Sequence, residues 1–483
     1  MAIDLSKPLR WQAATHEEQQ MLRALQGNIL KGHGRPETTN LFFRFDTGRS
    51  LESRRAVREI ANYHVTTAFE QLLQTQRYQH GGPTGKTFVG VFLSYTGYVA
   101  VGCEGAAPSA EPEFVKGMKD PASMAAVGDP VPAHRHWEPH FAQQIDAMVL
   151  IGDMERNGVR LERDQVVAIF ESAGAILLHE QRGSVVKDKN SNGIEHFGYV
   201  DGRSQPLLLV EDIEREARDA GIDRWDPQFD LGTVLVHDMP APDNISFGSY
   251  FVFRKLEQHV RAFKRREQQL ATKLGLTTAE AREIAGAMVI GRFEDGTPVT
   301  LSPEGRNQTP PNDFDFSGDN GTRCPFQAHI RKVNPRGSSP GGLADERQHI
   351  MARRGIPYED KIRAVHPSDV PGSDNLAEFD SKVARLLPVD KVGLLFMAYN
   401  SSLTRQFVFT QSSWASNGNF SVANTGIDPV IGQGFGIGTP LPKWPEQWDE
   451  PASTTQTFDF HGFVRMRGGE YFFAPSLSFL KAL

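Results

Sequence analysis

The sequence has little cysteine, no long apolar run and no excess of positive charge. Two cysteines in 483 residues cannot build a disulfide framework, so we expect a reducing compartment. No stretch reaches the roughly eighteen consecutive apolar residues of a membrane-spanning helix. A net charge of -7 argues against the basic surface that nucleic-acid binding requires. These absences exclude membrane and nucleic acid from the expected partners.

The N-terminal stretch MAIDLSKPLRWQAATHEEQQ also lacks the apolar segment of a signal peptide and a twin arginine. We therefore expect a cytoplasmic protein. Its composition, 39% hydrophobic and 23% charged, is that of a folded globular chain. The length fits two or three ordinary domains, or one large domain built from two halves. Whether the chain forms a homo-oligomer is left open.

Aromatic strands followed by charged helices occur in both halves of the chain. TNLFFRFD (39–46) precedes a helical pattern over 51–64, and GSYFVFRK (248–255) precedes a basic helical pattern. VGLLFMAYN (392–400) in turn resembles VGVFL (89–93). This self-similarity predicts two related halves, 1–235 and 236–483. The fold class expected is α+β, with antiparallel sheets covered by helices.

One conspicuous stretch is HFGYVDGRSQP, residues 196–206. Asp201 follows an aromatic and apolar run with a glycine inside it, and Gly202 comes next. An aromatic-glycine-aromatic pattern is typical of a wall packed against something flat. A carboxylate placed after such a wall has to be paired or used. Asp201 is therefore a candidate acid/base group.

A second stretch, RCPFQAHIRKVNPRG (323–337), holds His329 among cations that include Arg331 and Arg336. A single histidine is most often a core residue beside solvated charges. The charges nevertheless suit a large anionic ligand whose metal takes the imidazole nitrogen, and a haem is such a ligand.

MARRGIPY (351–358) adds a permanent cation, Arg353 or its neighbour Arg354, and GLLFMAYN (393–400) adds an apolar wall. Other patterns are weaker. Gly81–Thr87 fails as a phosphate loop because a strand pattern follows it. The spacing of His134, His136 and His140 suits a metal, but histidines in a proline-rich loop are more often solvated. Cys324 is expected to be a small buried hydrophobe.

Three segments together resemble motifs of the dye-decolourising peroxidases: GYVDGRSQP, CPFQAHIRKVNPR and MARRGIPY. LQGNILKGHGR near the start and GLLFMAYNSS near the end also fit. The resemblance covers most of the chain in the right order. The length and the IRKVNPR segment are most similar to the larger, cytoplasmic branch of that family.

The resemblance implies a pair of ferredoxin-like halves and a haem b cofactor. It implies roles for seven residues: His329 as axial ligand of the iron, Asp201 as distal acid/base, Arg353 as distal arginine with Arg354 as the alternative, Arg336 as propionate partner, and Gly202, Leu394 and Phe396 at the cofactor. An acid is also expected to hydrogen-bond the axial histidine. Its usual place offers only Gln406 and Gln411, which leaves Asp315, Asp319 or a neutral partner.

The activity implied is reduction of hydrogen peroxide to water through an oxoferryl intermediate, with oxidation of dyes, phenols or similar donors. One alternative is a haem-handling protein with incidental peroxidase activity. Chlorite breakdown is another, against which Asp201 argues. Bulky dyes do not fit inside a haem pocket, so Trp414, Tyr399 and Tyr358 are candidates for a route of electrons to the surface. Packing is the competing interpretation for each.

Overall fold

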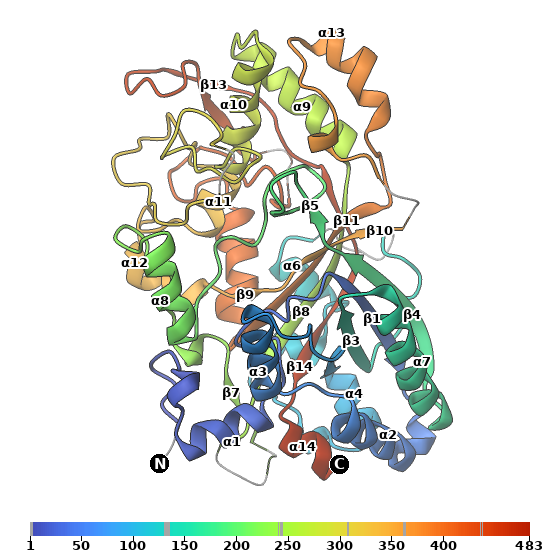
Figure 1. Cartoon of the computed structure of the whole chain (residues 1–483). Helices are drawn as coiled ribbons and strands as arrows, with labels where there is room; N and C mark the ends of the chain where they lie inside the picture. The colour runs from blue at the N-terminus through green and yellow to red at the C-terminus, as the bar shows by residue number, and fades with distance from the viewer. Residues whose placement is uncertain are drawn as a thin grey trace.

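A computed structural model describes residues 3–129, 136–239, 241, 245–306, 309–360, 364–434, 436 and 438–483. Its centre is one antiparallel sheet with helices around it (Figure 1). The strands run in the order β10-β11-β8-β14-β2-β3-β1-β4, with β7 paired to β8 and β9 to β11. Both chain ends lie toward the same end of the molecule, near α1 and α14 (Figure 1).

The strands of this sheet are β1 (Glu37–Arg44), β2 (Phe88–Leu93), β3 (Ala147–Asp153), β4 (Ile176–Ser184), β7 (Val236–His237), β8 (Phe247–Gln258), β9 (Ala352–Arg353), β10 (Ile356–Glu359), β11 (Val392–Asn400) and β14 (Val464–Ala474). Two small ribbons pair β5 (Val186–Lys187) with β6 (Gly193–Ile194), and β12 (Lys443–Pro445) with β13 (Thr455–Thr457).

The α-helices are α1 (His16–Ala24), α2 (Ser50–Tyr63), α3 (Ala68–Gln79), α4 (Tyr95–Ala100), α5 (Pro112–Lys116), α6 (Pro121–Ala126), α7 (Arg156–Ser172), α8 (Val210–Asp219), α9 (Val260–Lys273), α10 (Ala279–Ile290), α11 (His329–Val333), α12 (Gly342–Glu346), α13 (Leu376–Glu378) and α14 (Leu477–Ala482). Two π-helical segments, η10 (Thr404–Val408) and η11 (Thr410–Ala415), follow β11. Among the described residues, we find no helix with the length and apolarity needed to cross a bilayer.

The sheet contains the same strand order twice. Counting along the chain, β1, β2, β3 and β4 lie in the order second-third-first-fourth, and β8, β10, β11 and β14 repeat that order. This is the ferredoxin-like arrangement, so the expected α+β fold is confirmed. The sequence similarity between β1 with α2 and β8 with α9 matches equivalent elements, since β1 and β8 are each the first strand of their set. The similarity between the segments 89–93 and 392–400 does not, because β2 is the second strand of its set and β11 is the third.

The central strands are largely buried because both faces of the sheet are covered. Every residue of β2 is buried, and β1 is partly exposed only at its two end residues. Phe42 of β1 packs edge-on against Phe253 of β8, with ring centroids 4.9 Å apart. Buried strands of this kind are continuous hydrophobic runs with no alternation, which explains why apolar segments of different position looked alike in the sequence.

The two outer strands of the sheet approach each other, so the sheet curls toward a closed barrel. Gln181 of β4 donates from Nε2 to Asp360 Oδ1 just beyond β10, at 3.1 Å. Gly183 of β4 faces Ile356 of β10 so closely that a Cβ would lie 2.7 Å from Cγ2 of that isoleucine. Closing the sheet in this way leaves few free edges.

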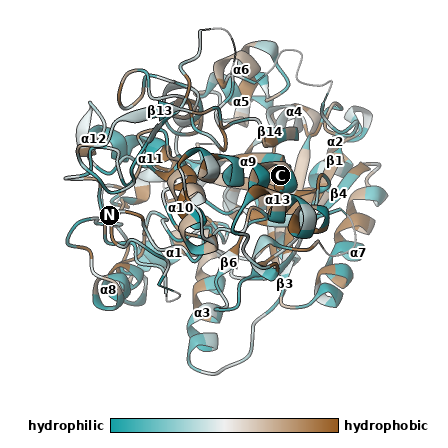
Figure 2. Cartoon of the chain, turned by 90° about the horizontal axis from the view of Figure 1, so that it is seen from above, coloured by the Kyte–Doolittle hydropathy of each residue, from teal (hydrophilic) through white to brown (hydrophobic). Residues whose placement is uncertain are grey.

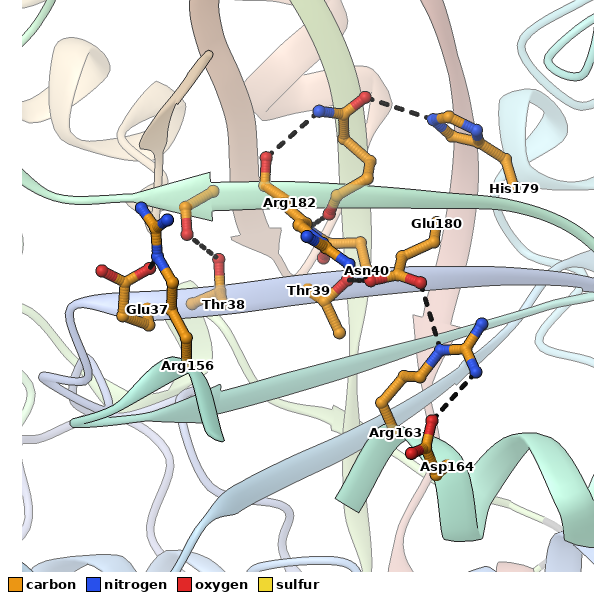
Figure 3. A network of polar contacts seen from close by, with 12 residues as sticks. Glu37, Thr38, Thr39, Asn40, Arg156, Arg163, Asp164, His179, Glu180 and Arg182 are labelled. Atoms are coloured by element: carbon orange, nitrogen blue, oxygen red, sulfur yellow. Dashed lines mark hydrogen bonds and ion pairs between the residues drawn. The ribbon is translucent and has the colours of Figure 1, made fainter. Parts of the chain in front are cut away.

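Polar side chains hold the outer strand β4 to its neighbours β1 and α7 (Figure 3). Arg163 of α7 donates to Glu180 of β4 at 3.1 Å, and Arg156 of α7 donates to Glu37 of β1 at 3.1 Å. In Figure 2 the peripheral helices α7 and α8 carry many hydrophilic residues. Near the N-terminus, α1 begins with a capping box between Thr15 and Glu18.

Candidate active site

One cavity brings together residues from both halves of the chain. Its wall includes all seven residues that the sequence predicted: Asp201, Gly202, His329, Arg336, Arg353, Leu394 and Phe396. Asp201 and Gly202 come from the loop after β6, whereas His329 begins α11 and Arg353 ends β9. Leu394 and Phe396 lie on β11. The fold therefore places in one cavity residues that are up to 195 positions apart in the sequence.

His329 is held by a buried carboxylate. Its Nδ1 donates to Oδ2 of Asp428 at 2.8 Å. The other oxygen of Asp428 accepts from the backbone N–H groups of Val430 and Ile431 at 2.8 and 3.0 Å. Burial alone would lower the pKa of His329, but the Asp428 carboxylate outweighs it and raises that pKa. With Nδ1 occupied, Nε2 is the nitrogen that remains for a ligand in the cavity.

The acid that contacts His329 is thus none of the residues considered from the sequence. Asp319 pairs with Arg331 at 2.8 Å, and Asp315 accepts from Ser317. Gln406 and Gln411 donate to backbone carbonyls of other segments. Asp428 was missed because it lies 99 positions after His329 in a loop. The one local signal is its place before Pro429, where an aspartate commonly caps the next backbone N–H groups.

Asp201 and Arg353 face each other in the cavity. Nη1 of Arg353 lies 3.5 Å from Oδ1 of Asp201, and the same oxygen accepts from the Gly202 N–H at 2.6 Å. Nη2 of Arg353 donates to the Ser204 carbonyl at 3.0 Å. Both side chains are about one-third exposed, 34% and 32%. The pair is therefore fixed in place and still open to a small molecule.

Arg354, the alternative cation, is occupied elsewhere. Its guanidinium donates to the carbonyls of Asn28 and Ile29 at 2.8 and 2.9 Å and to that of Arg353 at 2.8 Å. Burial lowers the pKa of Arg354 to about 10. It does not line the cavity that holds His329, and it borders a neighbouring one instead. The geometry favours Arg353 as the cation of this site.

Two buried arginines give the cavity a positive wall. Arg336 donates to the carbonyls of Asn312 and Phe314 and to the Ser204 hydroxyl, at 2.6 to 2.8 Å. Arg292 donates to the Gly296 carbonyl at 2.7 Å. Within the described ranges neither arginine forms an ion pair, and burial lowers the pKa of Arg292 to about 9. Unpaired buried cations are costly, so this wall suits an anionic ligand.

The remaining wall is largely apolar. Leu394 and Phe396 are joined by Phe316, Ile330 and Val333, among others. A flat, mostly apolar ligand with carboxylate groups and a metal fits such a cavity: imidazole for the metal, arginines for the carboxylates and apolar side chains for the ring. The residues present therefore fit a haem.

Among the described residues, the other aromatic, cysteine and histidine candidates from the sequence do not line this cavity. Trp414, Tyr399 and Tyr358 are only 1 to 2% exposed, which favours packing, the competing interpretation, for all three. Cys324 is fully buried, as predicted. Of the three loop histidines, His136 is exposed, His140 stacks on His179 with ring centroids 3.5 Å apart, and His134 lies outside the described residues.

The fold and cavity together define an α+β protein of two ferredoxin-like units, with an imidazole, a carboxylate and a guanidinium around one ligand cavity. The chain is 44% identical to the multifunctional dye peroxidase DyP2 of Amycolatopsis sp., over 100% of both sequences. It is 30% identical to the dye-decolorizing peroxidase msp1 of Mycetinis scorodonius, over 96% of this chain and 87% of the relative.

Solved structures agree. The structure of DyP2 from Amycolatopsis sp. matches with a TM-score of 0.90 and 42% identity over 100% of both chains. A DyP-type peroxidase of Anabaena sp. matches with a TM-score of 0.87 and 36% identity, over 99% of this chain and 98% of that one. No protein-family model matches the chain. The chain belongs to the family of dye-decolourising peroxidases, which confirms the resemblance drawn from its motifs.

Proposed function

We propose that this protein is a haem peroxidase that reduces hydrogen peroxide to water and oxidises dyes, phenols or similar small donors. The observation that carries the proposal is the shared cavity of the His329–Asp428 pair and the Asp201–Arg353 pair. The cofactor is haem b, held through Nε2 of His329. When bound, it supplies an iron that receives electrons from organic donors and passes them to peroxide.

Asp201 is the proton-transfer group. Its carboxylate takes a proton from the bound peroxide and returns it to the leaving oxygen, which departs as water. The Gly202 N–H fixes one carboxylate oxygen at 2.6 Å. Proton transfer by a positioned side chain contributes about 10²- to 10⁴-fold to a rate. The residues just before Asp201, Phe197, Tyr199 and Val200, line the same cavity as the acid. The HFGYVDG stretch therefore forms part of the cavity wall and carries the proton-transfer group.

Arg353 is the cation of the site. Its guanidinium stabilises the negative charge that develops as the O–O bond breaks. Its Nη2 donates to the Ser204 carbonyl at 3.0 Å. The backbone N–H of Arg353 donates to the side-chain oxygen of Gln205, also at 3.0 Å. These partners hold Arg353 in place beside Asp201.

Arg336 and Arg292 would bind the carboxylates of the cofactor, and Gly202, Leu394 and Phe396, which line the same cavity, would hold its ring. Asp428 positions the His329 ring and increases its basicity. We also propose that the chain divides into halves 1–235 and 236–483, so that Asp201 comes from the first half and His329 and Arg353 from the second. The repeated strand order supports this division.

A cytoplasmic location is also proposed, and the free thiols of Cys103 and Cys324 support it. The donors are expected to react without entering the haem cavity when they are bulky. Hydrogen peroxide, in contrast, is small enough to reach Asp201 and Arg353, which are each about one-third exposed.

The test is rapid mixing of the haem-loaded protein with hydrogen peroxide, followed by the Soret absorbance. Wild type should react quickly, whereas Asp201→Asn and Arg353→Leu should each slow the reaction by about 100-fold. Matched controls are Asp219→Asn and Arg265→Leu, which change exposed ion pairs outside the cavity. A Soret band of wild type that barely changes in excess peroxide would contradict the proposal and favour a haem-handling protein.

A further inference from the structure

A group of possible metal ligands lies next to, but outside, the cavity. It consists of His196, Glu359 and His366, each of which offers one ligand atom within 4.8 Å of the others. The residues come from the loop before Asp201, from the end of β10 and from the segment after it. Nε2 of His366 is 3.3 Å from Oε1 of Glu359. Among the described residues this group uses none of the side chains assigned to the peroxidase site.

The hydrogen bonding of His196 leaves one of its ring nitrogens available. The side chain is fully buried. Its Nε2 is 3.0 Å from the Tyr358 carbonyl, which only accepts, so Nε2 carries the hydrogen. Nδ1 is buried with no hydrogen-bond partner in the part of the chain that the structure describes. A ligating histidine characteristically donates its second ring N–H to a carbonyl or carboxylate and leaves the first nitrogen for the metal.

The imidazole rings of His196 and His366 are neighbours. Their centroids are 5.0 Å apart and their planes differ by 15°. The other such group in the described residues is Glu138, His140 and His179. Its rings stack more closely, at 3.5 Å, and Glu138 is paired with Lys255 at 2.9 Å.

We propose that His196 Nδ1, His366 Nε2 and a carboxylate oxygen of Glu359 bind a divalent first-row metal ion of the zinc class. Two imidazoles and one carboxylate are a common donor set for such an ion, and water completes a tetrahedral site. Donor atoms around tetrahedral zinc are about 3.4 Å apart. The three side chains therefore close by roughly 1 Å when the ion binds, which is within the reach of side-chain rotation.

The ion would connect the loop that carries Asp201 to β10 and to the segment after it. These parts already touch, because a Cβ on Gly198 would lie 3.1 Å from Cβ of Pro367. Gly198 has a positive φ of 101°, a conformation that favours glycine. The metal then acts as a cross-link that fixes the turn between His196 and Asp201. It carries no step of the peroxide reaction.

The test is equilibrium dialysis of the full-length, haem-loaded protein against Zn²⁺ after treatment with a chelator, with zinc and iron counted by mass spectrometry. Iron reports the haem separately from the zinc. Wild type should bind one zinc ion per chain. His366→Ala and Glu359→Gln should each weaken zinc binding by tenfold or more without loss of iron. The exposed His237→Ala is the matched control and should bind zinc as wild type does.

X-ray absorption at the zinc edge adds a second readout, with nitrogen and oxygen ligands at about 2.0 Å and the scattering of imidazole rings expected. Three results would overturn the proposal. In the first, wild type takes up no stoichiometric zinc. In the second, His366→Ala and Glu359→Gln bind zinc as tightly as wild type. In the third, His140→Ala abolishes binding and His366→Ala does not, which would assign the ion to the other group of histidines.

Discussion

Replacing Asp428 with asparagine should loosen the haem by changing which nitrogen of His329 carries the proton. In the native pair, Nδ1 of His329 donates to Oδ2 of Asp428 at 2.8 Å. An asparagine that keeps its Oδ1 on the N–H groups of Val430 and Ile431 presents its NH₂ group to His329. Since NH₂ only donates, Nδ1 must accept and the proton moves to Nε2. A protonated Nε2 has no lone pair for iron.

The opposite orientation of the asparagine amide is no better. It would keep the bond with His329 but set NH₂ against the backbone N–H groups of Val430 and Ile431, so that donors face donors. A buried hydrogen bond to a charged group contributes about 1.5–3 kcal/mol, which corresponds to a factor of roughly 10 to 150. We expect the haem affinity to fall by about 10- to 100-fold, the usual effect of removing the partner of a ligating histidine.

The assay is transfer of haem from the protein to an excess of a tighter haem-binding acceptor, followed by absorbance. Asp319→Asn is the matched control, because it breaks an ion pair with Arg331 in the same segment and leaves His329 untouched. The reasoning is refuted if Asp428→Asn releases haem no faster than the control while its circular dichroism matches that of wild type.

Three further predictions concern the surrounding residues. Arg336→Ala should weaken haem binding by about tenfold, more than the surface change Arg265→Ala, because a charge-assisted contact is lost; equal affinities would contradict it. Burial raises the pKa of Glu195 from 4.5 to about 7, so its contribution to stability is complete below pH 4.5 and is lost as the pH rises through 7. The melting temperature of wild type relative to Glu195→Gln should therefore fall over that range, and a constant difference would count against it. Asp129→Ala leaves the buried Arg254 without its partner at 2.6 Å and should cost about 3–5 kcal/mol in denaturant unfolding, whereas adding Arg254→Met should recover most of that loss.

The sequence alone indicated the candidate residues of the cavity, but not the residues that contact and position them. Asp201, His329 and Arg353 each stand in a short segment of unusual composition, so local patterns were enough to select them as candidates, and the structure places all three in one cavity. Asp428 stands in an ordinary loop, and only the fold brings it within 2.8 Å of His329. Arg292 was missed for the same reason, since nothing in the sequence shows that a single arginine will be buried without an acid.

The fold was predicted in outline only. An aromatic strand followed by a charged helix marked the start of each ferredoxin-like set correctly. Strands buried on both faces carry no alternation, so the apolar segments 89–93 and 392–400 were matched although they occupy different positions in the sheet. Burial of Trp414 and Tyr399 depends likewise on strands and helices far away in the sequence.

The most direct test of the account is whether His329 holds the iron. The measurement is the resonance Raman spectrum of the reduced, haem-loaded protein, in which an iron–histidine bond gives its own stretching band. Wild type should show this band, His329→Ala should lose it, and added imidazole should restore it by binding in the space left by the side chain. A band unchanged in His329→Ala would contradict the assignment of His329 and with it the proposed arrangement of the site.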